Sequence, residues 1–322
     1  MGPFIIYRTI PLMACACYPE GHMSNRDTKA YVFLLISSAF FASGYLLARY
    51  YNPGSGLGML ITQALFSGAL AITVVTWRVS WKIEPHHILP ICFNGVVSPV
   101  ILFTVWSGAM IVTPALAATI VISNAIMIAA ISWAIGRKTF VKVEVFALVI
   151  GFCGVVWIGL QRGAFGGEAV GIAFLLGGAA LIATITVAIE RAVMEAGGVT
   201  VTRWALWSSF FVALAFTWFT GRLKFYSVEQ SGLAFFMGVF SIGTSVALFN
   251  SGMSKIGAAD AAVFKLLIPF FALIYGIVFL GETPNMNSAV AAVVVILSVA
   301  LYQKANSGKI KKVTPREEAA TR

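Results

Sequence analysis

The sequence predicts an all-α membrane protein with ten transmembrane helices, arranged as two five-helix inverted repeats. Three observations support this prediction: ten apolar stretches that could each cross a bilayer, very short connections between them, and an internal repeat. A hydrocarbon core roughly 30 Å thick needs about 20 mostly apolar helical residues. AVILMFWYC residues form 59% of the chain and charged residues 11%, whereas soluble domains have about 45–50% apolar and about 25% charged residues.

The ten stretches follow one another in order along the chain. In the first half they are Ala30–Ala48, Leu57–Trp77, His87–Gly108, Ala115–Gly136 and Val145–Gln161. In the second half they are Ala169–Ile189, Trp204–Gly221, Gln230–Ser254, Ala258–Leu280 and Thr283–Gln303. The segments between them are too short to contain a soluble catalytic domain.

The basic residues indicate the orientation of the chain, whose net charge is +10 at pH 7. If the N-terminus is cytoplasmic, most of the 22 Lys and Arg residues lie on the cytoplasmic side, and the outer side carries Arg49, Arg162, Arg222 and Lys224. This asymmetry predicts an inner-membrane protein with both termini in the cytoplasm. The basic tail is then a topology anchor that attracts anionic lipid, and no nucleic-acid partner is expected.

The two halves share residues at a constant offset. Ser107–Met110 and Ser251–Ser254 each precede a helix, and Ala117-Ala118 matches Ala261-Ala262 at the same offset of 144 residues. Order and spacing together indicate a duplicated unit. The predicted divisions are an N-terminal segment (1–29), a first repeat (30–161), a second repeat (162–303) and a basic cytoplasmic tail (304–322). We expect residues 1–22 to be disordered, or to precede a native start at Met23.

An odd number of helices per unit places the second unit upside down relative to the first. The corner before the fifth stretch carries Arg137, Lys138 and Lys142, whereas the equivalent corner before the tenth carries Glu282 and no basic residue. This difference is expected if the two corners face opposite sides of the membrane. Inverted repeats are a common plan of secondary transporters, in which the substrate site lies near the midplane between the halves.

The second half also resembles a known family. The segments Gly252–Ala259, Ile268–Ala272 and Phe279–Thr283, together with Ile150–Val156 in the fifth stretch, are similar to the EamA domain of the drug/metabolite transporter superfamily. The resemblance extends over about Ala30–Gln303. It implies ten spans, two five-helix units, and export or exchange of small metabolites.

Three positions depart from the pattern of that family. Arg137 stands where the first unit usually has a corner Glu, Gln63 where Arg is common, and Ser298 where Gly is common. The departures leave the predicted fold intact but point to no subfamily.

Lys265 is the leading candidate for a substrate-binding residue. It lies seven residues past Ala258, about 10 Å into its helix at 1.5 Å per residue, where Lys costs about 2.5–3.5 kcal/mol. It either faces a cavity, holding an anionic substrate group or taking part in proton coupling, or snorkels to the interface. Asp260 lies about 140° away around the helix and fits better in its first turn. Pro269 predicts a kink, which is either a mobile hinge or static packing.

The other cavity candidates are Asn124, Tyr275, Tyr45, Trp106 and Gln63. An amide in hydrocarbon needs a partner, so Asn124 either contacts substrate or joins neighbouring helices. Gln63 has the same ambiguity, as do two further asparagines, Asn94 and Asn250. The aromatic candidates lie well within spans, and Tyr275 is about 80° from the face of Lys265 on a regular helix.

Two other features have ordinary structural interpretations. Glu190 ends the sixth stretch beside Arg191, which predicts an ion pair between sequence neighbours at the interface. Gly151 and Gly154 allow close helix approach and are candidates for a homodimer face.

Several classes of activity lack the residues that they need. The chain has no Walker motif, its histidines lie outside or at the edge of spans, and no carboxylate pair is buried in them. We therefore expect neither an enzyme nor a cofactor or metal site. The sequence predicts a secondary transporter that exports or exchanges a small polar or amphipathic metabolite by alternating access. A flippase for a lipid-linked substrate is the alternative.

Overall fold

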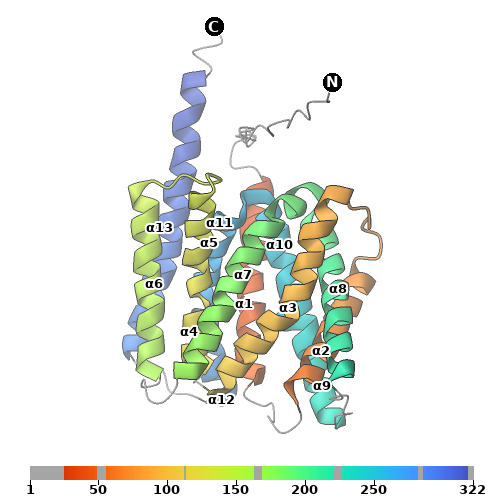
Figure 1. The fold of residues 1–322 in the computed structure, drawn as a ribbon. Coiled ribbons are helices and arrows are strands. Elements are labelled where there is room, and N and C mark those ends of the chain that lie inside the picture. Colours follow the sequence, from red (N-terminus) through yellow and green to blue (C-terminus); the bar gives the residue numbers. More distant parts are fainter. Residues whose placement is uncertain are drawn as a thin grey trace, which may run out of the picture.

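The protein is seen in a computed structural model, which describes residues 25–48, 56–111, 114–162, 169–220, 227–281 and 286–317. The expectation for residues 1–22 lies outside the described residues. Within the described ranges the chain is helical and has no strand, which confirms the predicted all-α class. Figure 1 shows the helices standing roughly side by side in one bundle, with the end of α13 extending beyond its upper face.

The elements of the first half follow the predicted stretches closely. They are α1 (Asn25–Ala48), α2 (Leu57–Val75), α3 (Pro85–Ile111), α4 (Pro114–Val121), α5 (Ser123–Ala134) and α6 (Lys142–Arg162). The fourth predicted stretch is divided between α4 and α5.

The second half contains two interrupted stretches. Its elements are α7 (Ala169–Ala196), α8 (Gly198–Phe219), α9 (Val228–Phe236), η2 (Met237–Thr244), α10 (Ser245–Ile256), α11 (Ala258–Val263), η3 (Phe264–Leu267), α12 (Ile268–Leu280) and α13 (Met286–Glu317). The element η2 is a π-helix and η3 is a 3₁₀-helix.

Seven helical segments among the described residues are long and apolar enough to cross a membrane, and a shorter apolar helix covers Val290–Asn306. The outside of the bundle is apolar as well. Large exposed side chains include Val75, Leu89, Phe146, Phe219 and Phe279. Soluble monomers rarely expose apolar surface on this scale, so these segments indicate a multi-pass membrane protein.

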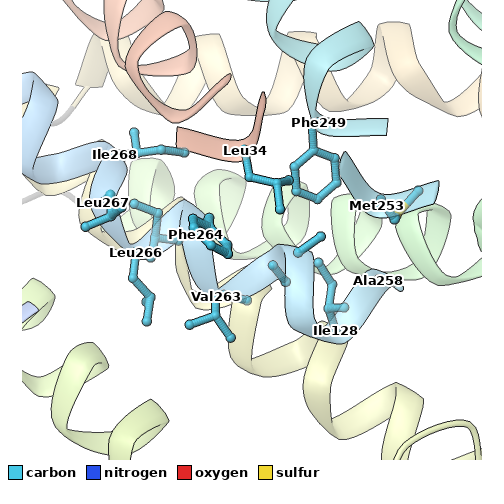
Figure 2. Packing of buried hydrophobic residues seen from close by; sticks show 14 of the residues in the cluster. Leu34, Ile128, Phe249, Met253, Ala258, Val263, Phe264, Leu266, Leu267 and Ile268 are labelled. Carbon is cyan, nitrogen blue, oxygen red and sulfur yellow. The ribbon is translucent and has the colours of Figure 1, made fainter. Parts of the chain in front are cut away.

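The helices pack in pairs that are distant in the sequence. The most extensive contacts are those of α6 with α13, α3 with α7, α1 with α10, and α2 with η2 and α8. Figure 2 shows the core where α1, α10 and the α11–α12 region meet, with Leu34, Phe249 and Phe264 close together. This core lies beside the cavity described below.

The contact between α6 and α13 uses the glycines of α6. A Cβ on Gly154 would lie 2.9 Å from Cγ2 of Val295, and one on Gly151 would overlap the hydroxyl of Ser298. Figure 1 shows the two helices side by side. Gly151 and Gly154 therefore allow a close helix approach within the chain, as predicted, and the candidate homodimer face stays a prediction.

Candidate functional site

A cavity of about 230 Å³ lies in the middle of the bundle. Residues from α1, α2, α3, α4, α5, α7, α8, η2, α10, η3 and α12 contribute to its wall, whereas the described lining includes no residue of α6 or α13. Most of the wall is apolar. Its polar lining residues are Asn94, Ser98, Asn124, Thr186, Ser209, Ser241, Asn250 and Lys265.

Lys265 is the one charged residue in the described lining of the cavity. Its side chain is 6% exposed, and its Nζ lies 4.1 Å from the ring centroid of Phe249 and 5.8 Å from that of Phe41. Among the described residues, Lys265 makes no ion pair or side-chain hydrogen bond. Cation–π contacts supply about 0.5–2 kcal/mol, which is less than the about 2.5–3.5 kcal/mol that a Lys costs at the centre of a membrane helix.

The backbone at Lys265 leaves the α-helical pattern. The α-helix ends at Val263, and the 3₁₀ turn η3 carries Lys265 before α12 begins with Pro269 in its first turn. Proline has no N–H to donate to the carbonyl four residues earlier, so the carbonyl of Lys265 accepts from the N–H of Ile268 instead. The hydroxyl of Ser38 donates to the carbonyl of Phe264 over 2.9 Å. The helix is thus irregular around Lys265, as a 3₁₀ segment before Pro269, and the role of Pro269 as a hinge stays a prediction.

Asn124 comes from a second interrupted helix. The break between α4 and α5 lies at Ile122, and Asn124 follows in the first turn of α5. The residue is buried, and its Oδ1 receives no hydrogen bond from the described residues. Asn124 and Lys265 thus enter the cavity wall from breaks in two different helices.

Of the remaining predicted candidates, Tyr45 and Trp106 line the cavity, whereas Tyr275 and Gln63 do not. The hydroxyl of Tyr275 donates to the carbonyl of Ala39 in α1 over 3.1 Å. The break at η3 explains the difference for Tyr275, because an angle of 100° per residue holds only along an uninterrupted helix. Gln63 lies on α2, and its Oε1 is buried with no partner among the described residues.

Asn94 and Asn250 line the cavity while bonding to protein groups. The hydroxyl of Ser98 donates to Oδ1 of Asn94 over 2.9 Å, and Nδ2 of Asn250 donates to Oγ1 of Thr202 over 2.9 Å. Sequence reasoning did not single out the lining residues Ser98, Thr186, Ser209 and Ser241. Isolated Ser and Thr are too common in membrane helices to carry a signal.

Charged residues are paired where α5 ends and α11 begins. Nη1 of Arg137 lies 3.0 Å from Oε2 of Glu190, whose Oε1 accepts from the N–H of Ala258 over 2.7 Å. The predicted pairing of Glu190 with its neighbour Arg191 is therefore wrong. The carboxylate instead joins α7 to the α5–α6 corner and to the N-terminus of α11, where the helix dipole favours negative charge.

A second pair lies beside the first. Nζ of Lys138 lies 2.6 Å from Oδ1 of Asp260, and the hydroxyl of Tyr302 donates to the same oxygen over 3.0 Å. Asp260 occupies the first turn of α11, as predicted. These contacts connect the α5–α6 corner, α11 and α13. We call Arg137, Lys138, Glu190, Asp260 and Tyr302 the paired charge layer.

Arg203 on α8 is fully buried and bonds to backbone. Its Nη1 donates to the carbonyl of Thr76 over 2.9 Å, and its Nη2 donates to those of Val79 and Ser80 over 2.8 and 2.7 Å. Its Cζ also lies 4.3 Å from the ring centroid of Trp81. Arg203 is one of the basic residues that the predicted orientation places on the cytoplasmic side, and the structure shows it holding the end of α2 and the following turn.

His86 and His87 at the start of α3 meet Glu195 near the end of α7. Nε2 of His87 lies 2.7 Å and Nε2 of His86 lies 3.4 Å from Oε2 of Glu195, and one donor atom from each residue fits within 4.8 Å. These three residues could hold a metal ion, an option that the sequence spacing did not suggest. They lie outside the cavity lining and tie α3 to α7.

Residues 169–303 match the sequence model of the EamA-like transporter family. The second half of the chain is therefore similar to EamA-like transporters, in agreement with the resemblance found in the sequence. The match begins at the first residue of α7 and ends within α13, so the matched segment includes Lys265 and Pro269. The apolar segments indicate a multi-pass membrane protein, and the match relates its second half to transporters.

The whole bundle has a counterpart among solved structures. One crystal structure superposes on this chain with a TM-score of 0.69 at 16% identity, covering 86% of this chain and 95% of the other. This likeness concerns the fold and extends well beyond the EamA-like half. No curated protein matches the chain in sequence.

Proposed function

We propose that the chain is a secondary transporter that exports or exchanges a small metabolite through the central cavity. The observation that carries the proposal is the position of the cavity, which lies where two interrupted helices contribute Asn124 and Lys265. Interrupted helices at matching positions of two repeats are the best structural pointer to a transporter substrate site. The proposed binding residues are Lys265, Asn124, Tyr45 and Trp106.

We propose further that residues 30–161 and 162–303 form two inverted five-helix units with ten spans in total. Reciprocal packing supports this proposal: α1 packs along α10 in the same way as α7 packs along α3. A Cβ on Gly108 of α3 would lie 2.6 Å from Cγ of Leu175 of α7, and a Cβ on Gly252 of α10 would lie 2.5 Å from Cγ of Leu34 of α1. The two glycines are equivalent in the sequence repeat, and so are their partner helices.

The corners and breaks support the same duplication. Gly136 ends α5 with φ +70° and Gly281 ends α12 with φ +65°, a left-handed conformation that glycine adopts without steric penalty. The breaks at Ile122 and at Phe264–Leu267 lie close to the repeat offset of 144 residues. Rocking of one unit against the other would expose the cavity to each side in turn.

The charge distribution supports an orientation with both termini in the cytoplasm. The proposed location is the inner membrane of the cell. Lys138, Arg191, Lys255 and Lys304 all lie in or beside connections that the ten-span arrangement places on one side. Basic residues concentrate on the cytoplasmic side of membrane proteins. Export follows from the implied family activity and remains part of the proposal.

The flippase alternative has no support from the comparisons or from the surroundings of Lys265. A lipid path would be favoured by a groove of exposed Phe side chains beside this residue. The described Phe neighbours of Lys265 are Phe249, which is buried, and Phe41, which is half-buried. A small metabolite bound in the central cavity fits these surroundings better.

Metabolite profiling of culture medium tests the transport proposal. Cells would express the wild type, Lys265→Ala, the matched control Lys255→Ala on the exposed end of α10, or no transporter, at equal membrane abundance. We expect at least one small molecule to accumulate outside with the wild type and with Lys255→Ala, and to fall to the vector level with Lys265→Ala. The proposal would be contradicted if the media of all four cultures had the same metabolite composition and if proteoliposomes transported no component of the cell's metabolite extract.

A further inference from the structure

The charge balance of the cavity narrows the class of its substrate. We propose that the cavity binds a small acid with one negative charge and an apolar body, and that the ammonium group of Lys265 holds its acidic group. The inference rests on the proposed transport function only in taking the central cavity as the substrate site. It adds the charge, the size and the character of the substrate.

The first step compares Lys265 with other cations whose partners the structure describes. Arg137 and Lys138, which are more exposed than Lys265, each face a carboxylate. The buried Arg203 donates to three backbone carbonyls. Lys265 is also buried but has ring faces as its described partners. A buried charge needs a hydrogen-bonded counter-charge. A bound anion would supply the negative charge and the hydrogen-bond acceptor that Lys265 lacks among the described residues.

The second step concerns the sign and number of charges. No Asp or Glu belongs to the described lining of the cavity, so a cationic substrate would meet Lys265 with no compensating carboxylate. A dianion, such as a phosphate monoester or a dicarboxylate, would bring one more negative charge than the described lining can pair. Burying that second charge in an apolar wall is unfavourable. A monoanion leaves the occupied cavity neutral.

The third step concerns the body of the ligand. Phe249 and Phe41 flank the ammonium group, and the cavity lining also includes Ile101, Ile185 and Leu206. The two rings offer aromatic faces next to the place where the acidic group binds, and the other side chains add apolar surface to the same cavity. The volume of about 230 Å³ is below the roughly 300–1,000 Å³ typical of sites for drug-sized ligands. A carboxylate attached to one ring or to a branched chain matches both the apolar lining and the small volume.

Asn124 gives this ligand a second polar contact. Its Oδ1 is buried and receives no hydrogen bond from the described residues, and an unpaired buried acceptor costs free energy. A hydroxyl or N–H group on the acid would satisfy this acceptor. Acids that carry such a donor should therefore bind more tightly than those that lack one.

Three probes of similar shape test the inference: phenylacetate, the neutral phenylacetamide and the cationic phenethylamine. Binding to the purified full-length protein in detergent is measured by isothermal titration calorimetry. We expect the wild type to bind the acid at least about tenfold more tightly than the amide, a difference of about 1.4 kcal/mol, and to bind the amine most weakly. Lys265→Met should remove the preference, Lys265→Arg should retain it, and the surface control Lys255→Met should match the wild type.

The outcomes separate this inference from the transport proposal. A wild type that binds the amide or the amine as tightly as the acid, or binds none of the three, overturns the inference. So does a preference for the acid that survives in folded Lys265→Met, whose folding is checked by its melting temperature. Flux of the acid in proteoliposomes is measured separately. Binding with charge preference but without flux would leave the inference standing and contradict transport, whereas flux without charge preference would do the reverse.

Discussion

The cavity around Lys265 and the paired charge layer differ in whether their cations face a carboxylate. In the layer, Arg137 faces Glu190, and Lys138 faces Asp260 at 2.6 Å. In the cavity, Lys265 lies 4.1 Å from a ring centroid and faces no described carboxylate. Both regions lie on interrupted or terminal parts of helices, so backbone irregularity alone does not separate them. This difference is what we expect if the layer holds helices together and, as we propose, the cavity keeps a charge available for a ligand.

Arg203→Met tests the structural side of this comparison and should have the largest effect. The substitution removes three hydrogen bonds to the carbonyls of Thr76, Val79 and Ser80. We expect the free energy of unfolding to fall by about 3–5 kcal/mol, as when one partner of a buried charged contact is removed. Thermal unfolding in detergent measures the change, with the exposed Arg191→Met as control. A melting temperature equal to that of the control would contradict the assigned role.

Lys138→Met breaks one pair of the paired charge layer. It leaves the carboxylate of Asp260 with the hydroxyl of Tyr302 as its described partner, and we expect a loss of about 2–3 kcal/mol, since the unpaired group keeps its desolvation penalty. The double variant Lys138→Met/Asp260→Asn should recover part of the loss, because it removes both charges. A double-mutant cycle measures this coupling. Strict additivity of the two single changes would show that the two residues do not act as a pair.

Lys265→Met should stabilise the protein, in contrast to the two preceding variants. Removing a charge that the cavity leaves unpaired is expected to raise the free energy of unfolding by about 1–3 kcal/mol, given the cost of Lys in a membrane helix. Transport of an acidic substrate should fall at least about tenfold, so stability and activity move in opposite directions. Both are measured on the same preparation. A destabilised Lys265→Met protein would place Lys265 with the structural charges instead.

Tyr275→Phe should have the smallest effect. It removes the hydrogen bond to the carbonyl of Ala39, and such bonds in membrane proteins contribute about 0.6 kcal/mol on average. Because Tyr275 lies outside the cavity lining, we expect flux within about twofold of the wild type, whereas Tyr45→Phe provides a comparison at the cavity wall. Flux through Tyr275→Phe that falls as far as that through Lys265→Met would mean that the substrate path extends beyond this cavity.

Much of the fold and part of the site could be predicted from local patterns. The lengths of the apolar stretches determine the helices, since a bilayer core demands long apolar runs. The internal position of Lys265 and the proline that follows it predicted a charged, irregular helix, and both features are present at η3. These results depend on residues that are close in the sequence.

Contacts between helices could not be predicted in the same way. Glu190 pairs with Arg137 rather than with its neighbour Arg191, because the carboxylate points toward a corner that only packing brings near. Gly151 lies against the side chain of Ser298 on α13, a partner helix that the sequence did not indicate. Each of these outcomes depends on which helix lies alongside, and apolar stretches of similar composition do not specify that choice.

The sequence by itself determined the membrane class, the helical segments, the resemblance of the second half to EamA-like transporters and the presence of one cation deep in a helix. Only the tertiary structure decided that Lys265 meets the rings of Phe249 and Phe41 in a cavity whose described lining holds no other charge, and that Tyr275 lies outside that lining. The physical reason is that helical periodicity relates residues along one unbroken helix. A break such as η3 ends that relation, and the partners of a buried charge are then set by the packing of distant helices.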